Sequence, residues 1–375
     1  MIIDSSTASD SVLFEEIPFF HQPHFRLGKA VLNRPLQKNA LNIDMVNRLF
    51  DRLSAWQNDP AIVAIWLEGA GQSFCAGGDV KAAVQEPKLA SAFFCAEYRL
   101  DALIHHYSKP VIAWGQGFIF GGGLGLWMGA DYRIACESAL FAMPESLIGF
   151  YPDVGAMYFL HKLPDDFGLF WALTATSINA VDALSLGVAD YIIASEHQAA
   201  ILTGLLQLPL NVHEDDSVHR MNDSMNDCIH LYLSAMQRDA SEFRATFQWY
   251  EVAPLLAPLL RCSSLSQVEK GLFTFENLPS VEKEGLWMRY KKASPFSLHT
   301  IFWLWQKTRN FELDAVFALD IKLAKFFVGH QPDFIEGVRA LLIDKDKNPK
   351  WHFSGDNVQG SGQWKQLNAA IEQNQ

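Results

Sequence analysis

A stretch of twenty residues without a single charge, residues 111–130, limits the possible folds of this chain more than any other feature. It is long enough to cross a bilayer. Seven of its residues are glycine, however, and Gln116 lies inside it. The stretch therefore divides into a buried strand at 111–114, a glycine turn and a short buried helix. We expect a globular α/β core here and no association with a membrane.

The rest of the first half follows the same alternation. Apolar residues recur at helical spacing over 43–56 behind Asn42, which is a favourable N-cap, and the apolar runs at 62–67 and 132–135 predict buried strands. Residues 1–208 therefore predict an α/β core, and residues 209–375 a mostly helical region that contains a Ser294-Pro295 helix start. We place the boundary between the two near residue 208.

Composition excludes several classes of function. The formal charge is −12 and no cluster of Lys and Arg stands out, which argues against nucleic acid as a partner. The five cysteines are widely spaced and form no CxxC pair, so neither a disulfide framework nor a zinc site is expected. The first residues lack the basic start and apolar core of a signal peptide. We expect a cytoplasmic protein.

Two glycine turns, at 74–79 and 120–123, each follow a predicted buried strand and each precede a helix. Such turns expose unpaired backbone amides, and two amides that point at one place can hold an oxygen that gains negative charge. The alternative is that the glycines only permit tight turns and close packing. A dinucleotide site is a weaker alternative, because Gly115, Gly117 and Gly121 miss the GxGxxG spacing by one residue.

The segment 141–155 is hydrophobic and contains only two acids, Glu145 and Asp153, each preceded by proline. A carboxylate among apolar groups loses hydration, so its pKa rises and it can exchange protons near neutral pH. The prolines restrict the backbone and help to orient the acids. The alternative is structural, with Glu145 as a loop cap and Asp153 as a turn former.

In this order and spacing, these motifs resemble the crotonase superfamily of enoyl-CoA hydratases and isomerases. The resemblance covers most of the chain and includes the segments 32–35 and 39–42, the Phe-Cys-Ala-Gly-Gly-Asp turn, Lys109-Pro110 and the Pro-Glu region. It implies a crotonase-like (ββα)n spiral core with a mostly helical C-terminal region that completes or covers an acyl-CoA site. It also implies that the backbone amides of Gly78 and Gly122 form an oxyanion hole for the thioester oxygen.

Within the superfamily, the chain most resembles the 3-hydroxyisobutyryl-CoA hydrolases. The supporting stretches are 93–98, 143–158 and 336–351, the last of them far from the core motifs. The resemblance implies hydrolysis of a short 3-hydroxyacyl-CoA, 3-hydroxyisobutyryl-CoA above all, as in valine catabolism. It makes Glu145 and Asp153 the catalytic acids and Glu97, Gly122, Glu145 and Asp153 the contacts of the substrate. Ala156-Met157 departs from the small residues usual there, which affects the expected acyl preference.

Enoyl-CoA hydration or isomerisation is the alternative within the same superfamily. The familiar hydratases place a second glutamate three residues after the oxyanion glycine of the triplet, and this chain has Gly125 there. The standard route of hydration therefore looks disabled, whereas Asp153 supplies the second acid expected of a hydrolase. A single glutamate is enough for an isomerase. A scaffold without activity would have lost the acids, and both are present.

The remaining candidates are less specific. Arg34 and Lys38 could contact the phosphates of coenzyme A. We expect no metal, because the polar run from His213 to His219 is more typical of a solvated surface, and no cofactor other than the coenzyme A of the substrate. Cys75 has no neighbouring histidine and is expected to be a small buried residue. The expected partners are the acyl-CoA substrate and further copies of the chain in a homo-oligomer.

Overall fold

The computed structural model describes residues 10–85, 87–209 and 218–372. Its larger sheet has the order β1-β2-β3-β4-β6-β9. The strands β1 and β2 pair antiparallel, and all later pairs are parallel. These strands are β1 (Val12–Pro18), β2 (Arg26–Leu32), β3 (Ile62–Gly69), β4 (Val111–Gly115), β6 (Tyr132–Ala135) and β9 (Tyr191–Ile192).

A second, smaller sheet lies beside the first and has the order β5-β7-β8. It consists of β5 (Phe118–Phe120), β7 (Leu140–Ala142) and β8 (Ile178–Asn179). The chain alternates between the sheets: β4 is followed by β5 and helix α4 (Gly122–Met128), and β6 by β7 and helix α5 (Ala156–Leu160). This strand, strand, helix repeat confirms the expected crotonase-like spiral.

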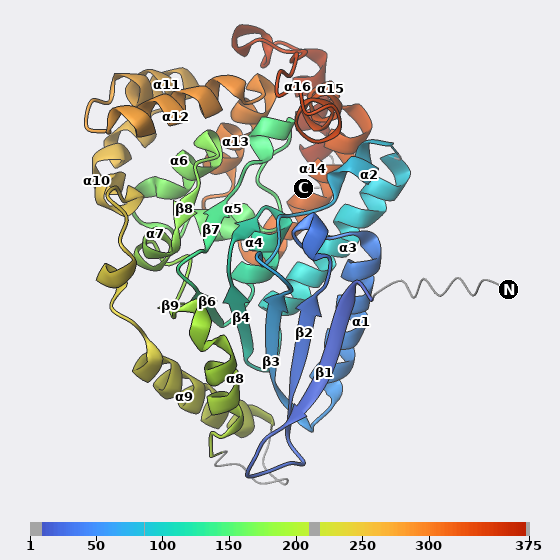
Figure 1. Cartoon of the computed structure of the whole chain (residues 1–375). Helices are drawn as coiled ribbons and strands as arrows, with labels where there is room; N and C mark the ends of the chain where they lie inside the picture. The colour runs from blue at the N-terminus through green and yellow to red at the C-terminus, as the bar shows by residue number, and fades with distance from the viewer. Residues whose placement is uncertain (1–9, 86, 210–217, 373–375) are drawn as a thin grey trace, which may run out of the picture.

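Helices cover both faces of the larger sheet (Figure 1). On one face lie α1 (Ile43–Asn58) and α3 (Pro87–His105), which pack against each other. The opposite face carries Trp66 and Trp114, which share an apolar cluster with α8 (Gln198–Leu206) and α9 (Val218–Met236). The sheet is therefore buried on both sides, as expected of parallel strands that read as continuous apolar runs.

The second half of the chain is helical, as expected. Figure 1 shows most of its helices at the end of the molecule opposite α8 and α9. They are α10 (Trp249–Leu260), α11 (Leu265–Thr274), α12 (Ser280–Lys292), α13 (Pro295–Lys307), α14 (Leu313–His330), α15 (Pro332–Val338) and α16 (Gly362–Glu372). Helix α14 packs directly on α3, so this region and the α/β core share one apolar interior. The division near residue 208 stays a prediction.

Several expected elements form where the sequence placed them. Asn42 caps α1 by accepting a 2.9 Å hydrogen bond from the amide of Met45, and the Ser294 side chain caps α13. The structure differs at 118–120, where the expected glycine turn contains strand β5. Two aromatic residues flanking Ile119 favour a strand there, between the glycines on either side. In the part of the chain that the structure describes, no helix combines the length and apolar character needed to cross a bilayer.

Candidate functional site

The two glycine turns lie side by side because the segments before them pair. Cys75 forms a parallel bridge with Ile119. The Cys75 amide donates to the Phe118 carbonyl at 2.9 Å, and the Phe120 amide donates to the Cys75 carbonyl at 3.0 Å. Gly78 and Gly122 each follow three residues after the bridged residue. The turns therefore leave the sheet at the same edge, as the carboxyl ends of parallel strands do.

The next repeat of the spiral brings Glu145 to the same edge. Phe141 of β7 pairs with Ile119 of β5, so the chain that leaves β7 reaches Glu145 beside the glycine turns. Glu145 begins a 3-10 turn, Glu145–Ile148, which we call the acid turn. A Cβ atom built at Gly121 would lie 2.7 Å from Glu145 Oε1. Three successive repeats thus supply Gly78, Gly122 and Glu145.

The backbone at both turns suits glycine. Gly77 has φ +98° and Gly121 has φ +50°, conformations that residues with a side chain rarely adopt. Among the described residues, the amides of Gly78 and Gly122 have no hydrogen-bond acceptor. A Cβ atom at Gly122 would lie 3.3 Å from the Gly78 nitrogen, so the two free amides are near neighbours. Gly78 is partly exposed, which opens the pair to solvent on that side.

Glu97 projects from α3 onto this pair. Its Oε1 atom occupies the space in front of Gly122, where any Cβ atom would collide with it, and lies 3.7 Å from the Cβ position of Gly78. Glu97 is 1% exposed and Glu145 is 6% exposed. Within the described chain, Glu97 Oε1 and Glu145 Oε2 have no hydrogen-bond partner. Glu97 therefore has a free oxygen beside the two amides, and Glu145 has one free oxygen while its other oxygen lies beside Gly121.

Asp153 is the fifth expected site residue, and Tyr98 holds its side chain in place. The Tyr98 hydroxyl donates a 2.6 Å hydrogen bond to Asp153 Oδ2. Burial raises the pKa of Asp153 to about 7, although the Tyr98 hydrogen bond acts in the opposite direction. The following turn is fixed by Asp320 of α14, whose Oδ2 accepts a 2.8 Å hydrogen bond from the Gly155 amide.

The acids influence one another because they are buried together. Burial raises the pKa of Glu145 well above its ordinary value, and the charge of Asp153 raises it further. Burial also raises the pKa of Glu97, to which the charges of Asp153, Asp101 and Glu145 contribute in that order. Burial therefore raises the pKa of all three acids, and that of Asp153 reaches about 7.

Sequence reasoning missed Asp101, Tyr98 and Asp320. Asp101 is fully buried on α3, and a Cβ atom built at Gly125 would lie 2.9 Å from its Oδ2. Although Gly125 has no side chain, α3 therefore supplies a carboxyl group at this place. The spacing gave a usable signal, since Asp101 follows Glu97 by four residues and lies on the same helical face. Nothing near Asp320 in the sequence indicated its role.

The C-terminal motif at 336–351 packs on the acid turn. Gly337 of α15 lies against the backbone of Ile148, and Gly149 lies against the backbone of Asp333, so neither position has room for a side chain. The Asp333 carboxylate accepts hydrogen bonds from the Ser294 hydroxyl at 2.6 Å and from the His352 amide at 2.7 Å. The C-terminal region is thus in direct contact with the turn that carries Glu145.

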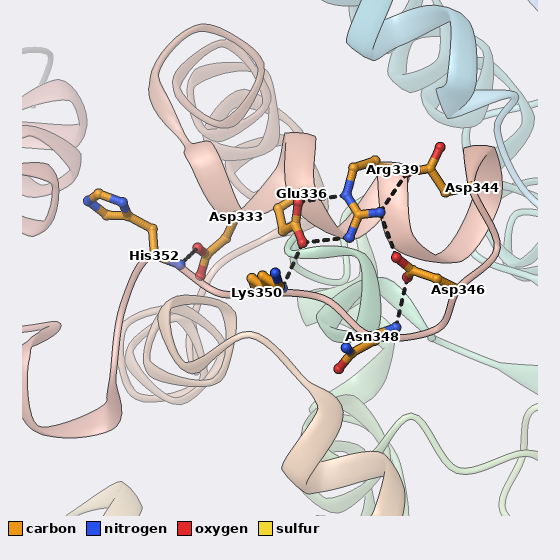
Figure 2. Close-up of polar contacts among 8 residues, drawn as sticks. All are labelled: Asp333, Glu336, Arg339, Asp344, Asp346, Asn348, Lys350 and His352. Atoms are coloured by element: carbon orange, nitrogen blue, oxygen red, sulfur yellow. Dashed lines mark hydrogen bonds and ion pairs between the residues drawn. The ribbon is translucent and has the colours of Figure 1, made fainter.

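An arginine organises the loop that follows α15 (Figure 2). The Arg339 guanidinium donates two hydrogen bonds to Glu336, at 2.9 and 2.8 Å, and one each to Asp344 at 2.6 Å and Asp346 at 2.7 Å. The Lys350 amide also donates to Glu336, at 2.6 Å. The charged residues of the motif therefore bind one another and hold the loop in place.

The two candidate cations differ in their surroundings. Arg34 donates to the Ala40 carbonyl at 2.6 Å and forms a 3.2 Å ion pair with Asp79, the residue after Gly78. The guanidinium of Arg34 thus holds the first glycine turn, residues 74–79, in place. Lys38 is exposed, with its ammonium 4.0 Å from the centre of the Phe118 ring. Contacts of either residue with coenzyme A stay predictions.

Cys75 is buried, as expected, and burial raises the pKa of its thiol to about 12. A thiol with this pKa is a poor nucleophile at neutral pH. Most of the polar run that begins at His213 falls in residues 210–217, outside the described residues.

Comparisons with known proteins agree with this architecture. A family model described as enoyl-CoA hydratase/isomerase matches residues 27–360. The mitochondrial 3-hydroxyisobutyryl-CoA hydrolase of Danio rerio is 34% identical over 92% of this chain and 86% of its own length. The small ribosomal subunit protein mS47 of Schizosaccharomyces pombe is 31% identical over 92% of this chain and 78% of its own. A solved enoyl-CoA hydratase of Rhodobacter sphaeroides matches with TM-score 0.77 and 25% identity, over 96% of this chain and 97% of that one.

The chain therefore belongs to the enoyl-CoA hydratase/isomerase family and has the crotonase fold. The expected resemblance to the 3-hydroxyisobutyryl-CoA hydrolases is confirmed, and it supports the expected class of enzyme, an acyl-CoA thioester hydrolase.

Proposed function

We propose that this protein hydrolyses a short 3-hydroxyacyl-CoA thioester, with 3-hydroxyisobutyryl-CoA as its substrate and 3-hydroxyisobutyrate and coenzyme A as products. The observation that carries the proposal is the meeting of two free amides, those of Gly78 and Gly122, with Glu145 beside them and Asp153 buried nearby. The hydrolase relative supports the same substrate.

The two amides are the proposed oxyanion hole. A thioester carbonyl placed between them gains negative charge on its oxygen when it is attacked, and the amides stabilise that charge without having to reorient. Glu97, which lies against Gly122, contacts the acyl end of the bound substrate. Asp153 contacts the 3-hydroxyl group of that end.

Glu145 and Asp153 carry out the proton transfers of the reaction. Hydrolysis needs a base for the incoming water and an acid for the departing sulfur. Asp153 ionises near neutral pH and accepts the proton of the water, whose oxygen bonds to the carbonyl carbon. Glu145 keeps its proton until the carbon–sulfur bond breaks and then donates it to the thiolate. The pair thus needs only one negative charge, which suits a buried site.

Attack by the carboxylate of Glu145 itself, through an anhydride, is the alternative route to the same products. A single turnover in H₂¹⁸O distinguishes direct attack by water from an anhydride that water opens at the carbonyl of Glu145. Direct attack by water places the label in 3-hydroxyisobutyrate during the first turnover. An anhydride that water opens at the enzyme carbonyl leaves the label in the protein, where mass spectrometry of the peptide that contains Glu145 detects it.

Enoyl-CoA hydration is the second candidate, and Asp101 is the observation in its favour. It places a carboxyl group beside Gly125, where this chain has no side chain of its own. The hydratase reaction consumes an enoyl double bond and releases no thiol, so the two activities are measured separately on the same preparation.

Glu145→Gln and Asp153→Asn test the proposed chemistry. Each removes one proton-transfer group from the site, and we expect thiol release to fall by at least about a hundredfold. Asp344→Asn is the matched control, because it makes the same kind of change at a half-exposed ion pair. Full activity in either site variant would remove that residue from the mechanism.

A further inference from the structure

The side chain of Asp101 has no partner although it is fully buried. The residue is 0% exposed, and neither carboxyl oxygen has a hydrogen-bond partner within the described residues. Helix α3 directs this group at α4, where it lies beside Gly125. Buried polar groups are almost always paired, so an unpaired carboxyl group at the base of a proposed active site calls for a function.

The groups around Asp101 are acids. Glu97 lies one turn earlier on α3, Asp153 comes from the loop before α5, and Asp320 comes from α14. Cys75, on the first glycine turn, keeps its proton because burial raises the pKa of its thiol. Burial is the largest cause of the raised pKa of Asp101. Among the described residues, the charges of Asp153 and Asp320 raise it further, in that order. Neither neighbour could neutralise an Asp101 carboxylate.

Hydrogen bonds decide which acid of this set carries charge. The Tyr98 hydroxyl donates to Asp153, and the Gly155 amide donates to Asp320, whereas Asp101 receives no donor. A carboxylate in a buried site is stabilised by donors, and two neighbouring carboxylates without a cation cannot both ionise readily. The donors therefore favour the ionised forms of Asp153 and Asp320, and the lack of a donor at Asp101 among the described residues favours its protonated form.

We propose that Asp101 is a positioning residue that stays protonated in the working enzyme, so that it adds no further negative charge beside the Asp153 carboxylate. When Asp101 loses its proton at higher pH, a second negative charge appears beside Asp153. That charge opposes the charge that develops on the thioester oxygen, and together with loss of the Glu145 proton it lowers activity on the alkaline side. The predicted effect on activity rests on the proposed hydrolysis. The protonation of Asp101 does not, because it is measured independently of activity.

Asp101→Asn tests the proposal because asparagine has nearly the shape of a neutral aspartic acid and cannot ionise. We expect the variant to hydrolyse the substrate at neutral pH within about threefold of the wild type. The acid limb of its kcat/KM profile should stay in place, while the alkaline limb should move to higher pH by about one unit or more. An alkaline limb that stays where it is overturns the proposal, and so does a loss of activity as large as that of Asp153→Asn.

Infrared spectroscopy of the substrate-free protein measures the proton directly. The difference spectrum of wild type minus Asp101→Asn at pH 7 should contain the carbonyl band of a buried, protonated carboxylic acid. A difference spectrum with carboxylate bands instead would overturn the proposal even if the protein proved not to be a hydrolase. Conversely, the carbonyl band together with absent thiol release would contradict the proposed function and leave the protonation of Asp101 established.

Discussion

Tyr98 and Asp153 are joined by a 2.6 Å hydrogen bond in the interior of the protein, with Tyr98 1% exposed and Asp153 5% exposed. The bond links α3 of the α/β core to the loop that follows the acid turn. It is the one side-chain hydrogen bond to Asp153 within the described residues, and it limits the rise that burial causes in the pKa of Asp153, which reaches about 7. The acidity of the proposed base thus depends on a tyrosine 55 residues away in the sequence.

Tyr98→Phe removes this hydrogen bond and should raise the pKa of Asp153. Asp153 then needs a higher pH to ionise, so the acid limb of the kcat/KM profile should move up by about one unit, while activity on the plateau changes less. Tyr107→Phe is the matched control, because it removes a 2.6 Å hydrogen bond to the Leu53 carbonyl, away from the acids. An acid limb that moves equally in both variants would assign the effect to general loosening of the fold.

Gly122→Ala should abolish most of the activity. The added methyl group would collide with Glu97 Oε1 and would lie 3.3 Å from the Gly78 nitrogen, in the space between the two amides. We expect thiol release to fall by about a hundredfold or more. Gly329→Ala is the control, because a Cβ atom there meets nothing within 4 Å and alanine favours the helix. Comparable loss of activity in the control would disprove a specific effect at Gly122.

Asp153→Asn should stabilise the protein at high pH. Asp153 has a pKa of about 7 in the folded protein against an ordinary value of 3.8. The folded state therefore binds more protons than the unfolded state between these values, and stability falls as pH rises from about 4 to about 7. We expect the variant to exceed the wild type by about 4 kcal/mol at pH 8 and to lose this advantage near pH 4. Urea unfolding at both pH values measures it, and equal stability at pH 8 would contradict the raised pKa.

Asp333→Asn should loosen the contact between the C-terminal region and the acid turn. The substitution turns one of two acceptor oxygens into a donor that faces either the Ser294 hydroxyl or the His352 amide. We expect a loss of about 2 kcal/mol in the free energy of unfolding, together with a lower kcat. Asp344→Asn, in the half-exposed ion pair with Arg339, should cost less than about 0.5 kcal/mol. Similar losses in both variants would show that Asp333 has no special role.

The elements that local patterns determine were predictable. The run of apolar residues behind Asn42 and the charge-free strand before Gly115 form as expected, because capping and periodicity act over a few residues. The resemblance also identified Gly78, Gly122 and Glu145, which the structure brings together. The pairing of Cys75 with Ile119, which does this, is a long-range contact that no local pattern contains.

Asp101 and Asp320 show where prediction from the sequence ends. A carboxyl group acquires its function from burial and from the acids around it, and both depend on how α3 and α14 pack. The sequence indicated that Gly125 has no side chain. It did not indicate that a residue twenty-four positions earlier would place a carboxyl group there.

The central claim is that this protein is a thioester hydrolase of short 3-hydroxyacyl-CoA. It is tested most directly by supplying 3-hydroxyisobutyryl-CoA, 3-hydroxypropionyl-CoA and crotonyl-CoA separately and recording both free thiol and the enoyl absorbance. We predict rapid thiol release from 3-hydroxyisobutyryl-CoA, with Asp153→Asn inactive, and little change in the enoyl absorbance of crotonyl-CoA. Rapid loss of the enoyl absorbance without thiol release from any of the three would contradict the account and make the protein a hydratase.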